Sequence, residues 1–223
     1  MRFKDRAEVA TQLADRLSPY RGRHPLVLGV ARAAVPMARI IAEALVGDLD
    51  VVLVRKLCAP GQPEFVIGAV EVTGAVVRGR YFHLAPAHYM RGEVRCQLEI
   101  LRRRQALYAS ARAAVDPAGR IVIIVDDGIA TGSTMLAAVR SVRGRQPERI
   151  VVAVGAAAPE ALAIMRAQAD DVVCLQSPPD FHGVGGCFAD FSEVTDEMVV
   201  GALVRPLAWS SGDSSPVQRV NRP

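Results

Sequence analysis

Apolar residues along the chain fall into short continuous runs, separated by longer stretches in which apolar positions recur every three or four residues. The continuous runs are rich in Val and Ile and bounded by turn residues, as is typical of strands buried on both faces. They cover residues 25–30, 49–57, 121–125, 149–157 and 171–176. Helical spacing covers residues 5–18, 31–45 after an initial loop, 86–112, 132–143, 159–169 and 196–204. This alternation predicts an α/β fold with a mostly parallel sheet flanked by helices.

Three stretches depart from the alternation. Residues 58–64 are rich in turn formers, and the apolar segments 65–70 and 74–79 after them could pair as a hairpin. Residues 177–194 are too long and too turn-rich for an ordinary connection, so we expect them to have a function. The polar stretch 209–223 is predicted to be a disordered tail, which leaves residues 1–208 as a single domain.

The long helix predicted at 86–112 carries two features. Its Leu98, Leu101 and Leu107 are spaced to form a packed face. It also carries a run of basic residues, Arg102 to Arg104, which could contact RNA or DNA. No aromatic residues are interleaved with this run, so we favour a solvated helix face or a contact in a homodimer over nucleic-acid binding.

Composition narrows the class of protein. Of the 223 residues, 51% are apolar and 22% are charged, which is typical of globular proteins, and no apolar run approaches a membrane span. The N-terminal helix is charged and amphipathic and does not resemble a signal peptide. The four cysteines lack metal-ligand spacing, which favours free thiols in a cytoplasmic protein. A net charge of +4 suits an enzyme that acts on polyanionic substrates.

The most informative stretch is residues 121–135, where a buried strand is followed by Asp126 and Asp127. The residues from Ala130 to Thr134 are small or carry hydroxyl groups, so their backbone N–H groups can face a ligand. A helix that begins near Ser133 adds its unpaired N–H groups and the positive end of its dipole. These features predict a phosphate site beside carboxylates that accept hydrogen bonds from hydroxyl groups. That combination fits a sugar phosphate, specifically ribose 5-phosphate.

This pattern resembles the motif of type I phosphoribosyltransferases that binds phosphoribosyl pyrophosphate (PRPP). The resemblance implies that Asp126 and Asp127 hold the ribose hydroxyls, and contact Mg²⁺ indirectly through PRPP. It also implies that a loop holds the 5-phosphate; its residues are Ala130, Thr131, Gly132, Ser133 and Thr134. Residues 177–194 would form a small hood over the acceptor, and the N-terminal helix is a second candidate for this role.

The resemblance extends over about residues 3–205, to one subfamily of predicted bacterial phosphoribosyltransferases whose acceptor is not settled. It is carried by residues 55–70, 102–108 and 184–197. The members of this subfamily usually have Pro-Arg-Gly-Gly-Val-Pro in the loop that approaches pyrophosphate. This chain has Ala31, Arg32, Ala33, Ala34, Val35 and Pro36 at these positions.

The two alanines of this loop bear on activity. Arg32 remains and is the third predicted catalytic residue, with Asp126 and Asp127. Each Cβ of Ala33 and Ala34 would narrow the approach to pyrophosphate, and a position that needs a positive φ would cost about 1–2 kcal/mol. Arg55 and Lys56, at the end of the strand 49–57, either neutralise pyrophosphate or form a solvated basic pair.

The resemblance leaves the acceptor open. The 6-oxopurine enzymes have an Asp at the position of Ala130, so their general acid or base is absent here. His182 is a candidate acid, base or stacking residue, although a lone histidine in a loop is more often simply exposed. Glu64 could bind Mg²⁺ or the acceptor, or cap a strand.

We therefore predict a pentosyl-transferring enzyme that uses Mg²⁺, releases pyrophosphate and moves the phosphoribosyl group of PRPP to a nitrogenous acceptor. The alternative is a catalytically weakened regulator that binds PRPP or a nucleotide. A phosphate-ester hydrolase is disfavoured because no metal cluster or water-activating base is apparent in the sequence.

Overall fold

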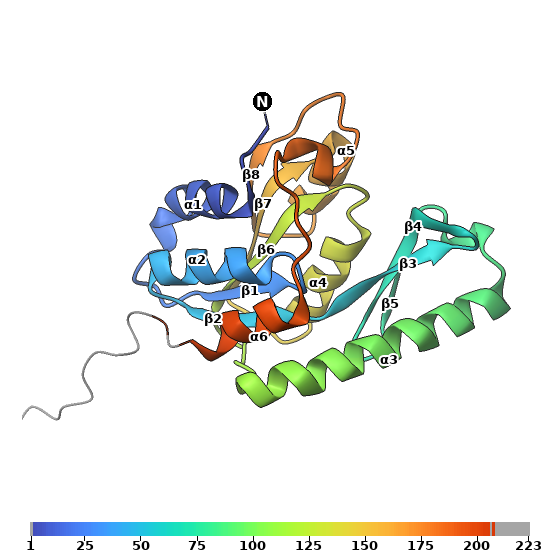
Figure 1. The fold of residues 1–223 in the computed structure, drawn as a ribbon, viewed down its shortest axis with the longest axis horizontal. Coiled ribbons are helices and arrows are strands. Elements are labelled where there is room, and N and C mark those ends of the chain that lie inside the picture. Colours follow the sequence, from blue (N-terminus) through green and yellow to red (C-terminus); the bar gives the residue numbers. More distant parts are fainter. Residues whose placement is uncertain (1, 206, 208–223) are drawn as a thin grey trace, which may run out of the picture.

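The computed structural model describes residues 2–205 and 207, and its central element is a parallel sheet (Figure 1). The sheet has five strands in the order β2-β1-β6-β7-β8. Their bounds are β1 Leu26–Val30, β2 Asp48–Val52, β6 Ile121–Ile129, β7 Arg149–Ala157 and β8 Asp171–Gln176. Leu26 of β1 pairs with Asp48 of β2 on one side and with Val122 of β6 on the other. β6 is thus the middle strand, which explains why residues 121–125 are continuously apolar.

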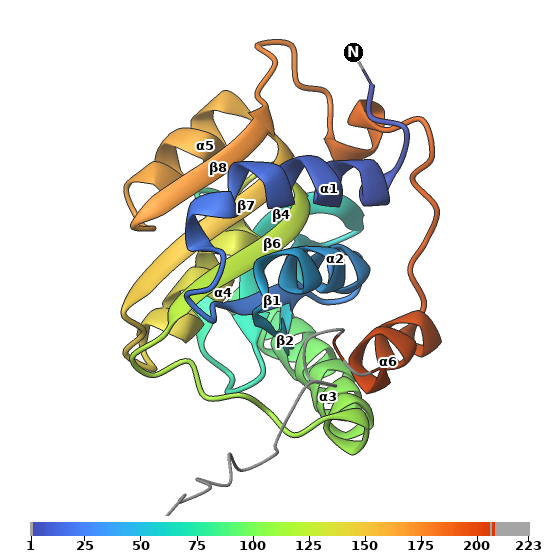
Figure 2. The same cartoon turned by 90° about the vertical axis from the view of Figure 1, so that its left-hand side faces the viewer.

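Helices cover both faces of this sheet (Figures 1 and 2). α1 (Arg6–Arg16) and α2 (Val35–Leu45) lie on one face, and α4 (Ser133–Arg143) and α5 (Pro159–Arg166) lie on the other. α6 (Asp196–Val204) packs beside α2 and α3. Short 3₁₀ helices occupy Ser18–Tyr20, Phe82–Leu84 and Val184–Cys187. The predicted α/β fold with a mostly parallel sheet flanked by helices is confirmed.

Residues 54–111 form a second, smaller layer that we call the arm, which projects from the main sheet (Figure 1). It contains the antiparallel strands β3 (Val54–Ala59), β4 (Gln62–Glu71) and β5 (Val76–Arg78), and the long helix α3 (Ala87–Ala111). β4 and β5 are the predicted hairpin. The arm has a separate apolar core made of Leu57, Ile67, Val70, Met90 and Leu101.

Three sequence predictions about individual elements are wrong. The predicted strand 49–57 is two strands, because β2 pairs with β1 only as far as Val52, whereas the residues after Leu53 pair with β4. β6 continues four residues beyond Val125, since its pairing with β7 extends to Ile129. On α3, Leu98 and Leu101 pack in the core of the arm as predicted, but Leu107 is exposed and Tyr108 is buried instead.

The N-terminal segment is tied to the irregular segment 177–194. The N–H of Phe3 donates to the carbonyl of Cys187 at 2.8 Å, and the N–H of Ala189 donates to the carbonyl of Phe3 at 2.7 Å. The rings of Phe3 and Phe188 pack together with centroids 5.5 Å apart. Two segments from opposite ends of the chain therefore form one structural unit.

Several predictions reach beyond these elements. In the part of the chain that the structure describes, no helix combines the length and apolar character that crossing a membrane requires. No disulfide joins Cys58, Cys96, Cys174 and Cys187, all of which lie within the described residues. The predicted tail 209–223 lies outside the described residues. The single domain 1–208, the cytoplasmic location and the homodimer stay predictions.

Candidate functional site

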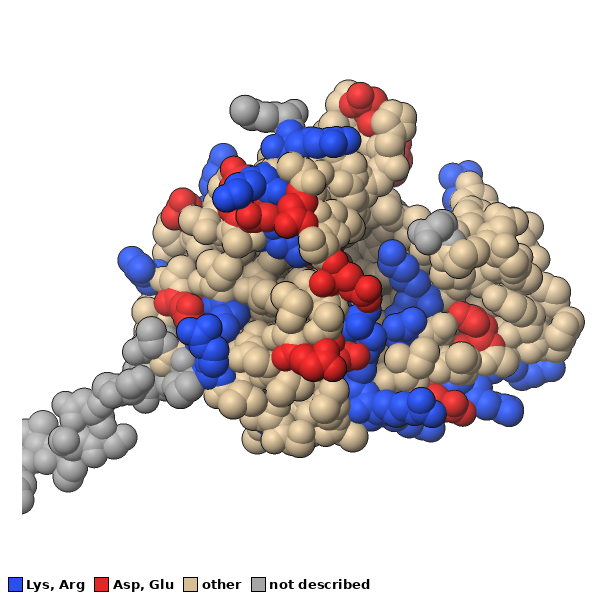
Figure 3. Space-filling model, viewed as in Figure 1, with Lys and Arg blue, Asp and Glu red and all other residues tan. Residues whose placement is uncertain are grey.

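A cleft of about 860 Å³ lies between the carboxyl ends of β1 and β6, the arm and residues 182–194. Lys, Arg, Asp and Glu side chains border the hollow in the middle of the molecule (Figure 3). Most predicted site residues line it: Ala31, Arg32, Ala33, Arg55, Lys56, Asp126, Asp127, Ala130, Thr131, Gly132 and Thr134. Ala34 and Ser133 are the exceptions, because both are buried beneath the cleft wall.

Asp126 and Asp127 lie within the last part of β6, rather than after its end as the sequence suggested. The N–H of Asp127 donates to Oδ1 of Asp126 at 2.9 Å. Burial, and then the neighbouring carboxylate of Asp127, raises the pKa of Asp126 well above its usual range. Burial also raises the pKa of Asp127, although the guanidinium of Arg6 opposes this shift. The pair is therefore an acidic centre whose negative charge is costly until a cation or hydrogen-bond donors reach it.

Arg6, at the start of α1, is a site residue that sequence reasoning missed. Its Nε and Nη2 both lie 2.9 Å from Oδ2 of Asp127, and its Nη1 donates to the carbonyl of Ser192 at 2.6 Å. Its guanidinium stacks over the ring of Phe191 at 4.0 Å. Arg6 thus links the acidic pair to the hood segment. No periodicity or motif in the sequence signals this role, because the contact joins residues 121 positions apart.

The loop before α4 has the shape of an anion site. Gly132 is the N-cap residue with φ 82°, in the left-handed region that glycine tolerates best. In the described part of the chain, no side chain at the N-cap position accepts a hydrogen bond from the first turn of this helix. The N–H of Ser133 makes a long hydrogen bond, of 3.5 Å, to the hydroxyl of Thr131. The first N–H groups of α4 and the positive end of its dipole are therefore available to an anion.

Gly128 lies between the acidic pair and this loop, and it lets the hood come close to β6. A Cβ at this position would lie 2.7 Å from Cγ1 of Val184 and 2.8 Å from the carbonyl oxygen of Ala156. The absence of a side chain is therefore required for Val184 to close over the strand. Val184 lines the cleft together with His182, Gly183, Gly185 and Phe191.

The loop between β1 and α2 holds Arg32 in the cleft. The peptide bond between Ala31 and Arg32 is cis. Neither Ala33 nor Ala34 has a positive φ, so the backbone strain predicted for these alanines is absent. Ala34 is the N-cap of α2 with φ −90° and is fully buried, so only the Cβ of Ala33 can narrow the cleft.

The arm contributes Arg55 and Lys56 from within β3, not from the end of a parallel strand. The Nε of Arg55 donates to Oε1 of Gln97. Burial lowers the pKa of Arg55, and the nearby guanidiniums of Arg104 and Arg32 lower it further. Arg55 is therefore a half-buried cation beside other cations, and only Lys56 fits the solvated alternative.

Arg104 of α3 is a second site residue that sequence reasoning missed. The interpretation of Arg102 to Arg104 as a solvated face or a dimer contact is wrong for Arg104, whose side chain is 13% exposed and lines the cleft. Its spacing was an available signal, because Leu101 precedes it by three residues and Tyr108 follows it by four, and both are buried.

Comparison with known proteins gives a consistent result. The model of the phosphoribosyl transferase domain matches residues 3–191. A protein of Mycobacterium tuberculosis that is provisionally named a phosphoribosyl transferase is 39% identical over 209 residues. The match covers 91% of this chain and 46% of that protein, so the chain spans about half the length of the curated relatives it matches.

A solved structure shows the same fold. The crystal structure of TT1426 from Thermus thermophilus is 44% identical with a TM-score of 0.76, and the match covers 92% of this chain and 98% of that one. A hypoxanthine phosphoribosyltransferase from Staphylococcus aureus is more distant, at 12% identity and a TM-score of 0.47 over 78% of this chain and 73% of that one.

Proposed function

Since this chain belongs to the phosphoribosyl transferase family, we propose that it binds PRPP and transfers the phosphoribosyl group to a nitrogenous acceptor, releasing pyrophosphate. The observation that carries the proposal is the convergence of three features in one cleft. These features are a buried acidic pair, a helix N-terminus open to an anion, and a wall of guanidinium groups. They match the three parts of PRPP, which are a ribose diol, a 5-phosphate and a pyrophosphate.

In this proposal each part of the cleft has one role. Asp126 and Asp127 accept hydrogen bonds from the ribose hydroxyls, and the N–H groups of residues 130–134 hold the 5-phosphate. Arg32, Arg55, Lys56 and the backbone of residues 31–33 hold the pyrophosphate. The acceptor would bind between the ribose and the hood, beside Val184 and Phe191, which line the cleft.

The acidic pair also fits a magnesium ion that arrives with PRPP. Mg²⁺ prefers oxygen ligands and usually keeps several waters, so one or two carboxylates and substrate phosphates suffice to hold it. Among the described residues no cluster of three or more potential metal ligands occurs, and the donor set is the pair itself. When bound, the ion supplies charge neutralisation to the pyrophosphate.

The reaction would proceed by attack of the acceptor nitrogen on C1 of the ribose while the bond from C1 to the pyrophosphate oxygen breaks. The bonding electrons leave with pyrophosphate, so negative charge grows on the leaving group and positive charge on the ribose ring. Arg32, Arg55 and Lys56 would stabilise the leaving group, and the acidic pair would fix the ribose close to the acceptor. Residues 182–194 would limit access of water.

The test is calorimetry with PRPP in the presence of Mg²⁺, followed by a panel of nucleobases and other nitrogenous acceptors scored for pyrophosphate release. We expect saturable binding of PRPP and release of pyrophosphate with one acceptor class. A protein that binds neither PRPP nor ribose 5-phosphate would rule the proposal out.

The alternative, a weakened regulator, has Ala33 as its remaining support, and separate replacements test it. In a weakened protein, Ala33→Gly should raise the affinity for PRPP up to about tenfold, because it removes the Cβ that faces the cleft. Ala34→Gly is the matched control: it should leave affinity unchanged, because Ala34 does not line the cleft, and the loss of its buried methyl group should lower stability by at most about 0.8 kcal/mol. Calorimetry and thermal melts measure both effects. If Ala33→Gly binds PRPP no better than the natural protein, Ala33 does not weaken binding. The regulator alternative then loses its support, and the proposed enzyme activity is favoured.

A further inference from the structure

We infer that Arg104 of α3 is an additional ligand of the pyrophosphate group, and that the carboxylates of Glu193 and Asp196 occupy its place until the substrate displaces them. This inference rests on the proposed function, because it takes the anion in this part of the cleft to be pyrophosphate. It adds Arg104 from the arm helix, Glu193 near the end of the hood and Asp196 at the start of α6, none of which the sequence analysis assigned to a site.

The carboxylate of Asp196 lies between two guanidinium groups. Its Oδ1 is 3.2 Å from Nε of Arg104, and its Oδ2 is 3.9 Å from Nη1 of Arg32. Arg32 also donates to Oε1 of Glu193. Arg32 and Arg104 come from the β1–α2 loop and from α3, so two separate elements converge on the same anionic groups. A bridging phosphate has the charge and the number of acceptor oxygens to satisfy both guanidiniums.

The charge balance favours an incoming anion. Arg32, Arg55, Lys56 and Arg104 line this part of the cleft, and Glu193 and Asp196 are the acids that pair with Arg32 and Arg104. Arg55 donates its hydrogen bond to the neutral amide of Gln97, and its pKa is lowered partly by the positive charges of Arg104 and Arg32. Repulsion among the cations is therefore only partly relieved, and a pyrophosphate group would relieve it further.

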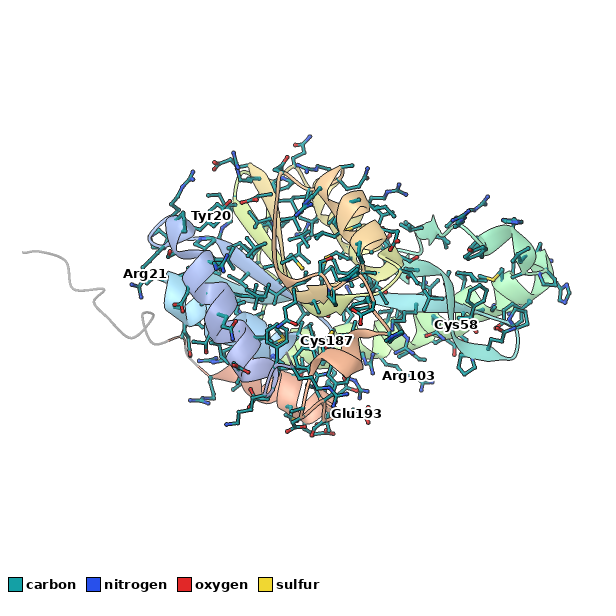
Figure 4. All side chains as sticks on the ribbon, turned by 90° about the horizontal axis from the view of Figure 1, so that it is seen from above. Tyr20, Arg21, Cys58, Arg103, Cys187 and Glu193 are labelled. Atoms are coloured by element: carbon teal, nitrogen blue, oxygen red, sulfur yellow. The ribbon has the colours of Figure 1, made fainter. Side chains whose placement is uncertain are left out.

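The two carboxylates differ in how firmly they are held, because Asp196 also accepts a hydrogen bond from the hydroxyl of the buried Tyr108, whereas Glu193 pairs with Arg32 at the surface. The side chain of Glu193 is 75% exposed, and exposed ion pairs are weak because water and salt compete for them. Glu193 lies in the irregular segment just before α6, so it can move without disturbing the parallel sheet, whereas Asp196 is the first residue of α6. Figure 4 shows Glu193 in this irregular segment and Arg103 on α3.

The experiment compares Arg104→Gln with Arg103→Gln, an exposed arginine one position away on the same helix. Calorimetry is done with inorganic pyrophosphate and, separately, with ribose 5-phosphate, each with Mg²⁺. We expect Arg104→Gln to weaken pyrophosphate binding about tenfold or more and to change ribose 5-phosphate binding less than about twofold. Arg103→Gln should change neither. Arg104→Lys, which keeps the charge but loses the planar fork, should be intermediate.

A second comparison separates ligand binding from support of α6. Glu193→Gln and Asp196→Asn remove the competing charges, so pyrophosphate affinity should rise about two- to fivefold. If Arg104 acted only by anchoring α6 through Asp196, then Asp196→Asn would weaken pyrophosphate binding as Arg104→Gln does. That outcome, or an unchanged affinity in Arg104→Gln, would overturn the inference. Absence of all binding in the natural protein would instead remove the proposed function, and the inference with it.

Discussion

Replacing both Asp126 and Asp127 with asparagine is expected to abolish Mg²⁺-dependent binding of PRPP and ribose 5-phosphate while the fold stays intact. Each carboxylate would otherwise accept a charge-assisted hydrogen bond worth about 1.5–3 kcal/mol, so the loss exceeds a hundredfold. Calorimetry measures the affinity, and circular dichroism checks the fold. Unchanged affinity for both ligands would remove the assignment of the ribose site.

The two single replacements, Asp126→Asn and Asp127→Asn, should change the stability of the protein in opposite directions. The pKa of Asp126 is raised in the folded protein, so the folded state binds more protons than the unfolded one, and stability falls as pH rises above the ordinary Asp range. Asp126→Asn removes that penalty and should raise the melting temperature at neutral pH. Asp127→Asn leaves Arg6 half-buried without its carboxylate partner and should lower it.

The same pKa shift predicts how ligand binding depends on pH. The ionised pair is the form that accepts hydrogen bonds from hydroxyl groups, so acidification should weaken ribose 5-phosphate binding. Because the pKa of Asp126 is raised, this loss should begin at a higher pH than for an ordinary aspartate.

Gly132→Val is expected to reduce the affinity for ribose 5-phosphate by about fivefold to thirtyfold. A Cβ here would make only ordinary contacts with Ala161 and Met165, at 3.7 Å each, so no steric clash is involved. The effect comes instead from φ 82°, which a β-branched residue adopts at a cost of about 1–2 kcal/mol or avoids by turning the loop N–H groups away from the anion. Calorimetry with ribose 5-phosphate measures the loss.

Gly119→Val is the matched control for this loop. Gly119 also has a positive φ, 66°, and a Cβ there would meet nothing within 4 Å. It lies in the turn before β6, at the opposite end of the strand from the cleft, so it should destabilise the protein comparably and leave binding unchanged. Equal binding by both variants and the natural protein would count against the phosphate loop.

The sequence predicted the parts of the site that are local in the chain. Residues 121–134 carry a strand, two acids, a glycine and a helix start in one continuous stretch, and each has a recognisable pattern. Residues 177–194 stood out because they have no periodic pattern, and they contact both Phe3 before α1 and Arg6 at the start of α1; that they form a hood over the acceptor stays a prediction.

The remaining features depend on tertiary contacts. A continuous run of apolar residues at 49–57 cannot show that pairing changes partners at Leu53, because both halves favour strand equally. Arg6 reaches Asp127 only after the whole sheet has formed. The φ values of Ala33 and Ala34 could not be read from their relatives' glycines, since a glycine does not prove that a positive φ is needed.

The strand order has a consequence for the synthesis of this protein on the ribosome. β1 pairs with its second neighbour, β6, only late in synthesis, because β6 begins at Ile121 and the entire arm is synthesised before it. At roughly 5–20 residues per second, one edge of β1 stays unpaired for several seconds. The arm has its own apolar core and can become compact during this interval. The nascent chain would then reach β6 with β3, β4 and β5 already paired with one another, which removes these strands as wrong partners for the open edge of β1.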